Sequence, residues 1–326
     1  VIFILFAIPL YLANSKVEVY YKLDQSLPET LESIQGNNIL KEKFNIVSPE
    51  IILMDKDIKN DDINKMIDEI KEVEGIDFIL SSSNLSNLGI TNEMLPSKLN
   101  NIIESENYQL LLVNSTYDIA TDELNNQVDV VNKIIKKYDK NSILAGEGPL
   151  MKDLVNTSDT DFNNVNYSSM ICILLIMFVV LKSLSLPFLL ILTIEFAIIT
   201  NMSVSYFSGT VLPFVAPIVL GTIQLGATID YAILMTTNYI KRRKDGMDKN
   251  KAMKETLSFC CNSIIVSGMC FFAATFGVGV YSKLEMVASL CTLISRGALI
   301  SMFTVIVILP CVLLTFDKII MKTTKI

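Results

Sequence analysis

Long apolar runs occupy the chain from about Val165 to Phe316, whereas the stretch between Asn14 and Asn164 is polar. A helix needs about 20 residues to cross the hydrocarbon core of a bilayer, and the apolar runs approach or reach that length. Short polar or turn-forming segments separate the runs. The pattern therefore predicts membrane-spanning helices over residues 167–181, 187–207, 211–239, 259–280 and 286–316.

The first 13 residues are also apolar, but they are too few to span a bilayer. They lack a basic flank, and we interpret residues 1–13 as the end of a truncated first transmembrane helix. A cleaved signal peptide is the alternative interpretation. With the five later spans, the expected fold is an α-helical membrane protein of six helices.

The polar stretch shows alternating patterns typical of a mixed α+β domain. Its apolar spacing predicts helices over residues 28–44, 61–73 (with Asn60 as cap) and 121–138. The expected apolar faces are Ile63, Met66, Ile67 and Ile70 in the second helix and Leu124, Val128, Val131 and Ile135 in the third. Short β-rich runs predict strands over 50–54, 76–80, 108–113 and 142–145, with a polar loop over 81–92. The order β-α-β-β-α-β is that of the ferredoxin-like split motif. A helical segment over 149–163 would lead into the membrane.

Charge separates the same two parts of the chain. Residues 14–164 contain 14 lysines and 27 acidic residues, while the remainder has a net charge of +6. Basic residues follow the expected spans at Lys182, at Lys241–Lys244 and in the C-terminal tail, and all fall on one side. By the positive-inside rule that side is cytoplasmic. We expect a multi-pass protein of the cell membrane with an extracytoplasmic domain at 14–164, helices at 165–320 and a cytoplasmic tail at 321–326.

Several classes of function are excluded by what the sequence lacks. All six cysteines lie in the apolar part, so a disulfide framework is not expected in the polar domain. No metal-ligand spacing and no catalytic constellation occur. We expect no enzyme activity, no cofactor, no metal and no nucleic-acid partner. The basic run at Lys241–Lys244 sets topology or, alternatively, binds anionic lipid head groups.

Asp230 stands out because it lies inside the fourth predicted span. It is about 16 Å from Lys241 along a helix, near the middle of a hydrocarbon core about 30 Å thick. A charge at such depth costs roughly 2.5–3.5 kcal/mol on insertion scales, so such residues are rare and commonly functional. The chain contains no histidine. A proton relay would therefore consist of Asp230, the adjacent Tyr231 and water.

Other residues extend this hypothesis or compete with it. Gly226 and Ala227 lie one turn before Asp230 and would allow another backbone or water to approach. Glu195 reaches a similar depth in the third span and is either a relay member or a buried hydrogen-bonded acid. The competing interpretation of Asp230 is a fixed ion pair with Arg296. The alternative for Arg296 is a side chain that extends to the membrane interface.

The stretch from Ile223 to Leu234, Ile-Gln-Leu-Gly-Ala-Thr-Ile-Asp-Tyr-Ala-Ile-Leu, resembles the fourth-helix signature of MMPL-type transporters. These belong to the resistance–nodulation–division (RND) superfamily. The segment from Leu309 to Leu314 resembles the Leu-Pro-Ala-Leu-Leu ending of that family's sixth helix, with Cys311 in place of the usual alanine.

The resemblance implies one half of a tandem transporter, with the polar segment as a porter domain. It assigns the proton relay to Asp230 and Tyr231 only; Glu195 and Arg296 match no family motif. The missing half would be a partner, either from the same polypeptide or as a second copy. The implied function is export of hydrophobic or amphiphilic molecules, lipids or drugs, across the cytoplasmic membrane, driven by protons. The alternatives are a proton-coupled accessory of protein secretion and a membrane sensor or scaffold that transports nothing.

Overall fold

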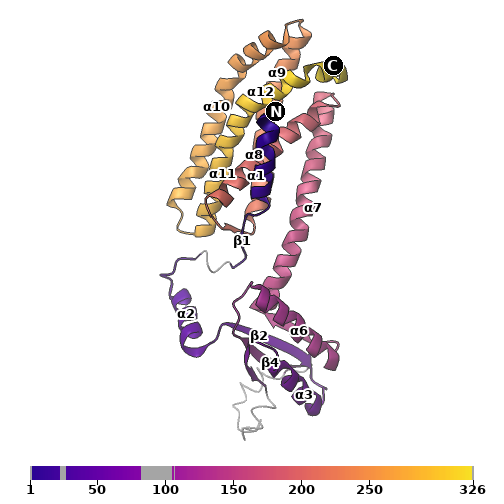
Figure 1. The fold of residues 1–326 in the computed structure, drawn as a ribbon. Coiled ribbons are helices and arrows are strands. Elements are labelled where there is room, and N and C mark those ends of the chain that lie inside the picture. Colours follow the sequence, from indigo (N-terminus) through magenta and orange to yellow (C-terminus); the bar gives the residue numbers. More distant parts are fainter. Residues whose placement is uncertain (1, 23–26, 82–104, 106, 325–326) are drawn as a thin grey trace. The chain divides into compact units, whose positions relative to one another are not determined.

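The computed structural model describes residues 2–22, 27–81, 105 and 107–324 (Figure 1). The chain divides into two compact units. The α+β unit comprises residues 28–158, and the helical unit comprises residues 1–27 together with 159–326. Helix α7 (Glu147–Leu181) begins in the α+β unit and continues into the helical unit. Residues 14–27 and 159–164 thus group with the helices, although hydropathy assigned them to the polar domain.

Four antiparallel strands form the sheet of the α+β unit, in the order β3-β4-β2-β5. The central pair is in register along its whole length, from Ser48 opposite Ser115 to Asp55 opposite Tyr108. Alternate residues of β2 are buried, so one face of the sheet carries the core. The strands are β2 (Ser48–Asp55), β3 (Ile76–Leu80), β4 (Tyr108–Ser115) and β5 (Ile143–Gly146).

Two amphipathic helices cover this face and contribute to the same core. Helix α3 (Asn60–Lys71) buries Ile63, Met66, Ile67 and Ile70, the face that its spacing predicts. Helix α6 (Asp122–Tyr138) likewise buries the predicted Leu124, Val128, Val131 and Ile135. Thr121 caps α6, because its hydroxyl accepts a hydrogen bond of 3.3 Å from the backbone N–H of Leu124.

Some predicted boundaries differ from the structure. Lys59, rather than Asn60, occupies the cap position of α3, and no side-chain cap forms there. Helix α2 (Glu32–Phe44) begins four residues later than predicted and buries none of its residues. Without a buried face, apolar spacing has little power to place its start. The predicted loop over 81–92 lies outside the described residues apart from Ser81.

Glu50 is the exception on the buried face of β2. Its side chain is fully buried, and neither carboxylate oxygen has a hydrogen-bond partner among the described residues. Gly148, in the first turn of α7, lies so close that a Cβ atom there would be 2.7 Å from Glu50 Oε1. Burial raises the pKa of Glu50 to about 7.

The helical unit contains five helical segments that, within the described part of the chain, are long and apolar enough to cross a membrane. They are α7, α8 (Leu186–Phe207), α9 (Ala216–Lys244), α10 (Lys249–Tyr281) and the continuous segment formed by α11 (Glu285–Phe303) and α12 (Leu309–Thr323). The shorter α1 (Ile2–Asn14) lies along α8 (Figure 1), where the Ser203 hydroxyl donates a 2.6 Å hydrogen bond to the Leu10 carbonyl.

A π turn (Thr304–Ile308) joins α11 to α12 without interrupting the helix. Pro310 follows directly and has no N–H to donate to the preceding turn. A π turn is one of the recognised ways in which a helix accommodates such a residue. The sixth predicted span is thus a single segment that changes its hydrogen-bond pattern midway.

A buried charge pair joins α9 to α12 near their ends. Arg243 donates from Nε and Nη2 to the two carboxylate oxygens of Asp317, at 2.8 Å each. The Tyr239 hydroxyl donates to the same carboxylate at 2.6 Å. Asp317 is only 4 % exposed. At least one member of the basic run at Lys241–Lys244 therefore holds two helices together.

We predict that Glu50→Gln stabilises the α+β unit at neutral and alkaline pH. The folded pKa of about 7 lies above the ordinary value of 4.5, so wild-type stability is highest below pH 4.5 and falls as pH rises toward 7. The total loss is about 3 kcal/mol, and it should be absent in the variant. Hydrogen exchange of β2 amides between pH 5 and 8 measures it. The exposed Glu147→Gln is the control and should keep the wild-type pH dependence.

We also predict that Asp317→Asn destabilises the helical unit by about 3 kcal/mol, because the substitution leaves Arg243 without its charged partner. Glu255→Gln removes a longer and more exposed ion pair with Arg242, at 3.7 Å, and should cost less than about 1 kcal/mol. Thermal unfolding in detergent compares the two variants. Equal stability of both would contradict the structural role of Asp317.

Candidate functional site

Helix α9 places Asp230 at its midpoint, 14 residues from Ala216 and 14 from Lys244. The Asp230 side chain is exposed on the outside of the helical unit. It makes no hydrogen bond or ion pair with any residue that the structure describes. At 1.5 Å per residue, it lies about 21 Å from either end of the helix. A carboxylate thus emerges halfway along an apolar helix, on an uncovered face.

That uncovered face of α9 is a stripe at helical spacing. Gly226 lies on it one turn before Asp230, and a Cβ atom added to Gly226 would meet nothing within 4 Å. Ala227, also predicted to lie beside the relay, is partly buried and faces inward toward a small cavity. We call the outward set the α9 stripe; it consists of Thr222, Ile223, Gly226, Asp230 and Thr237, all exposed.

Tyr231 turns inward instead of sharing the stripe. Successive residues of a helix are rotated by about 100°, so neighbours in sequence face different surroundings. The Tyr231 ring packs against the apolar core, and its hydroxyl lies 3.3 Å from the Ser267 hydroxyl of α10. It also borders an internal cavity of about 10 Å³, close to the space that one water needs.

A hydrogen-bonded network crosses the unit from α11 to this cavity. Arg296 donates to the Asn201 side chain at 2.7 Å, and the Asn201 amide donates to Gln224 at 3.0 Å. Gln224 donates to the Ser301 hydroxyl at 3.0 Å, and Thr228 reaches the same hydroxyl at 2.8 Å. We call Arg296, Asn201, Gln224, Ser301 and Thr228 the polar network.

The polar network extends to the small cavity that Tyr231 borders. Gln224, Thr228 and Ser301 all line the small cavity that Tyr231 borders. None of Asn201, Gln224, Thr228 and Ser301 was predicted from the sequence as a site residue. The signal was available, since uncharged polar side chains inside apolar spans are also costly unless they find partners.

Close packing of α11 against α8 and α9 depends on Gly297. A Cβ atom at this position would lie 2.7 Å from Asn201 Nδ2 and 2.8 Å from Gln224 Oε1. Any side chain here would separate the two amides. The glycine therefore allows the central hydrogen bond of the polar network to form.

Arg296 does not pair with Asp230, although an ion pair was one interpretation of the sequence. Its guanidinium instead binds the side chain and carbonyl of Asn201 and the hydroxyl of Ser205, all on α8, at 2.7–2.9 Å. The reading of Asp230 as half of a fixed Arg296 pair is thus wrong for this fold.

Glu195 occupies a different location from Asp230. It lines a pocket of about 320 Å³ between α1, α7, α8 and α9, and Asp230 is not among the residues around that pocket. One oxygen of Glu195 is buried and has no hydrogen-bond partner within the described ranges. The structure therefore does not bring the two carboxylates together, and a role for Glu195 in the relay stays a prediction.

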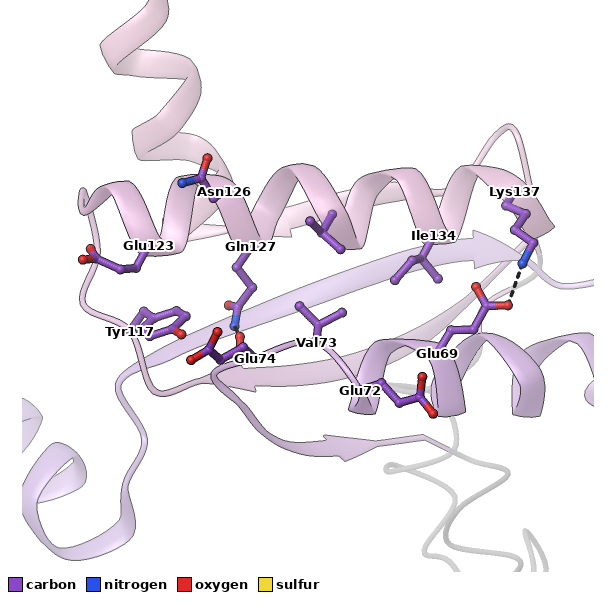
Figure 2. A pocket seen from close by; sticks show the side chains of 11 residues that line it. Glu69, Glu72, Val73, Glu74, Tyr117, Glu123, Asn126, Gln127, Ile134 and Lys137 are labelled. Carbon is purple, nitrogen blue, oxygen red and sulfur yellow. Dashed lines mark hydrogen bonds and ion pairs between the residues drawn. The ribbon is translucent and has the colours of Figure 1, made fainter.

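The α+β unit has a hollow of its own, of about 770 Å³, between α3 and α6. Figure 2 shows Lys137 and Glu69 facing each other across it, at 2.6 Å, while Gln127 extends toward Glu74 and donates to its carbonyl. The remaining acidic residues along it, Glu72, Glu74 and Glu123, are exposed to solvent. This arrangement contains no nucleophile with a matching base.

Comparison with known proteins gives a consistent family assignment. The sequence model described as "MMPL family" matches residues 89–324. A protein described as "Probable transport protein MmpL12", from Mycobacterium tuberculosis strains CDC 1551 / Oshkosh and ATCC 25618 / H37Rv, is 22% identical over 173 residues. The match covers 52% of this chain but 15% of the relative's length. Because the family model covers well over half of the sequence, the chain belongs to the MMPL family.

Proposed function

We propose that this chain forms one half of a proton-driven transporter that exports hydrophobic or amphiphilic molecules across the cytoplasmic membrane. Its membership of the MMPL family and the printed description of its relative as a transport protein support transport in general terms. The observation that carries the proton-coupled form is Asp230, a partnerless and exposed carboxylate at the midpoint of an apolar helix.

The exposure of Asp230 implies that something covers it. A carboxylate facing lipid at this depth would cost several kcal/mol, so such residues nearly always face protein or water. We propose that a second transporter half, from the same polypeptide or another copy, packs against the α9 stripe. The open space beside Gly226 allows a close approach of that kind.

The proposed mechanism begins with proton binding at Asp230. Neutralising the carboxylate removes its attraction to polar groups of the opposing half and lets the helices shift. The membrane potential contributes about 2.3 kcal/mol per charge per 100 mV. Tyr231, at the internal cavity, would transmit this change to the polar network, which links α8, α9 and α11. Cargo would then pass through the α+β unit.

The wider architecture follows the same proposal. We place the α+β unit outside the cell as a ferredoxin-like porter domain, which agrees with its strand order β3-β4-β2-β5. The C-terminus and the loop after α9 would be cytoplasmic, on the strength of their basic residues. Helix α1 would contribute to the first of six helices in this half.

The decisive test is Asp230→Asn in the intact transporter that contains this chain. The amide keeps the shape of the side chain but cannot exchange a proton, so export driven by a pH gradient should fall at least about ten-fold. Uptake of a fluorescent lipid into inverted vesicles measures the rate. Unchanged thermal unfolding would show that the loss is not caused by misfolding.

Asp245→Asn is the matched control, because Asp245 is exposed at the end of the same helix. It should export at the wild-type rate. If Asp230→Asn retains full proton-driven export, the relay proposal fails. Parallel assays with a lipid and with a secreted protein distinguish cargo export from an accessory role in protein secretion.

A further inference from the structure

A second pocket of the helical unit lies at the end where α8 turns into α9. It has a volume of about 280 Å³ and is bordered by β1 (Val19–Tyr20), β6 (Leu212–Pro213), α8 and α11. The parallel pairing of β1 with β6 sets Tyr20 opposite Pro213 and holds it at the pocket. Arg296 lines the same pocket from α11, and Ser205 lines it from α8.

Arg296 enters this pocket with a positive charge that no carboxylate neutralises. Its partners, Asn201 and Ser205, are uncharged, and they engage only Nε and Nη2. The two N–H groups of Nη1 have no acceptor in the part of the chain that the structure describes. A guanidinium does not lose its proton in proteins, so the charge persists. A partly buried and uncompensated cation of this kind favours an anion beside it.

The Tyr20 hydroxyl is a second hydrogen-bond donor at this pocket. Its hydroxyl is buried and has no hydrogen-bond partner among the described residues. Burial, and then the nearby charge of Glu285, raise the pKa of Tyr20, so the phenol remains protonated. Two donors from different elements, the buried Tyr20 hydroxyl and Nη1 of the partly buried Arg296, therefore border one pocket, and neither has an acceptor among the described residues.

Glu285 is the other charged residue that lines the pocket, and its negative charge limits where in the pocket an anion can bind. It is exposed, in the first turn of α11, 11 residues before Arg296. That separation corresponds to about 16 Å along the helix axis. The positive end of the pocket therefore lies at Arg296, whereas the charge of Glu285 acts on Tyr20, which can still donate a hydrogen bond because its phenol remains protonated.

We propose that this pocket binds an oxyanion, the phosphate or carboxylate of a head group, through Arg296 Nη1 and the Tyr20 hydroxyl. With Nε and Nη2 engaged by Asn201 and Ser205, Nη1 offers a charge-assisted hydrogen bond to the anion, and the phenol adds another. The volume suits a head group rather than a whole lipid. The exposed Val211 on the pocket's border offers an apolar surface for the attached chain. Binding at this pocket does not require proton-driven export.

The test uses the full chain, purified in an uncharged detergent, and three soluble probes. Dihexanoyl phosphatidic acid carries the phosphate, dihexanoylglycerol lacks it, and inorganic phosphate lacks the acyl chains. Calorimetric titration should show the phosphatidic acid binding at least ten-fold more tightly than the diacylglycerol. Competition by inorganic phosphate at similar concentrations would identify a free anion as ligand; tighter binding of the lipid would identify a head group.

Variants locate the binding in this pocket. Arg296→Gln should weaken binding of phosphatidic acid about ten-fold or more, in line with the loss of a charge-assisted hydrogen bond. Tyr20→Phe should weaken it about three- to ten-fold. Since Tyr20→Phe removes only a hydroxyl without a partner, it remains informative if Arg296→Gln fails to fold.

Matched controls come from the connection between α10 and α11. Lys283→Gln removes an exposed positive charge, and Tyr281→Phe removes an exposed phenol; neither residue lines the pocket. Both should bind as the wild type does. The proposal is overturned if the wild type does not distinguish phosphatidic acid from the diacylglycerol, or if Tyr20→Phe and a folded Arg296→Gln bind unchanged.

Discussion

The scarcity of polar partners inside an apolar bundle constrains most of what is unusual in this protein. Each charged or amide side chain that enters the helical unit must find a partner there, because hydrocarbon provides none. Asp317 has Arg243 and Tyr239. Asn201 and Gln224 have each other. Glu195 and Asp230 have no side-chain partner among the described residues, and of these two only Asp230 is exposed on the outside of the unit, which is why we propose that another protein surface covers it.

Structural and functional charges in this unit differ by their position on the helix rather than by residue type. Both Asp317 and Asp230 are associated with α9. Asp230 is a residue of α9, and Asp317 belongs to α12 and pairs with Arg243 of α9. Asp317 is enclosed and paired, which holds α12 against α9. Asp230 faces outward and makes no side-chain hydrogen bond or ion pair with any described residue of its own bundle. A relay needs such freedom from partners, and an anchor needs the opposite.

Much of the fold was predictable because burial imposes periodicity. The faces of α3 and α6 were correct residue by residue, since each packs on one side of a sheet and only that side is apolar. Helix α2 was placed less well, because none of its residues is buried. The spans were predicted from their length and hydropathy. These properties identify segments that suit a lipid environment, but they do not show which face of a helix packs against which neighbour.

The candidate site was predictable only in part, for the same reason. Asp230 could be found because a carboxylate in an apolar run is conspicuous. Asn201, Gln224 and Ser301 could be noticed as polar residues in apolar spans, but their pairing could not be predicted, since it depends on three helices bringing them together. Nor could the sequence place Arg296, whose direction follows from its contacts with Asn201 and Ser205 on α8. The burial of Glu50 was not predicted, because a predicted strand of only five residues does not show that one of its carboxylates faces the core.

The π turn between α11 and α12 has a consequence for both ends of that segment. Such a turn holds one residue more than an α turn, so everything beyond it is rotated by about 100° relative to an unbroken helix. Arg296 lies before the turn and contacts α8, whereas Asp317 lies after it and contacts α9. The additional residue determines the angle about the helix axis between the Arg296 and Asp317 side chains. Without the additional residue, a continuous α-helix could not keep both the Arg296 contact with α8 and the Asp317 contact with α9.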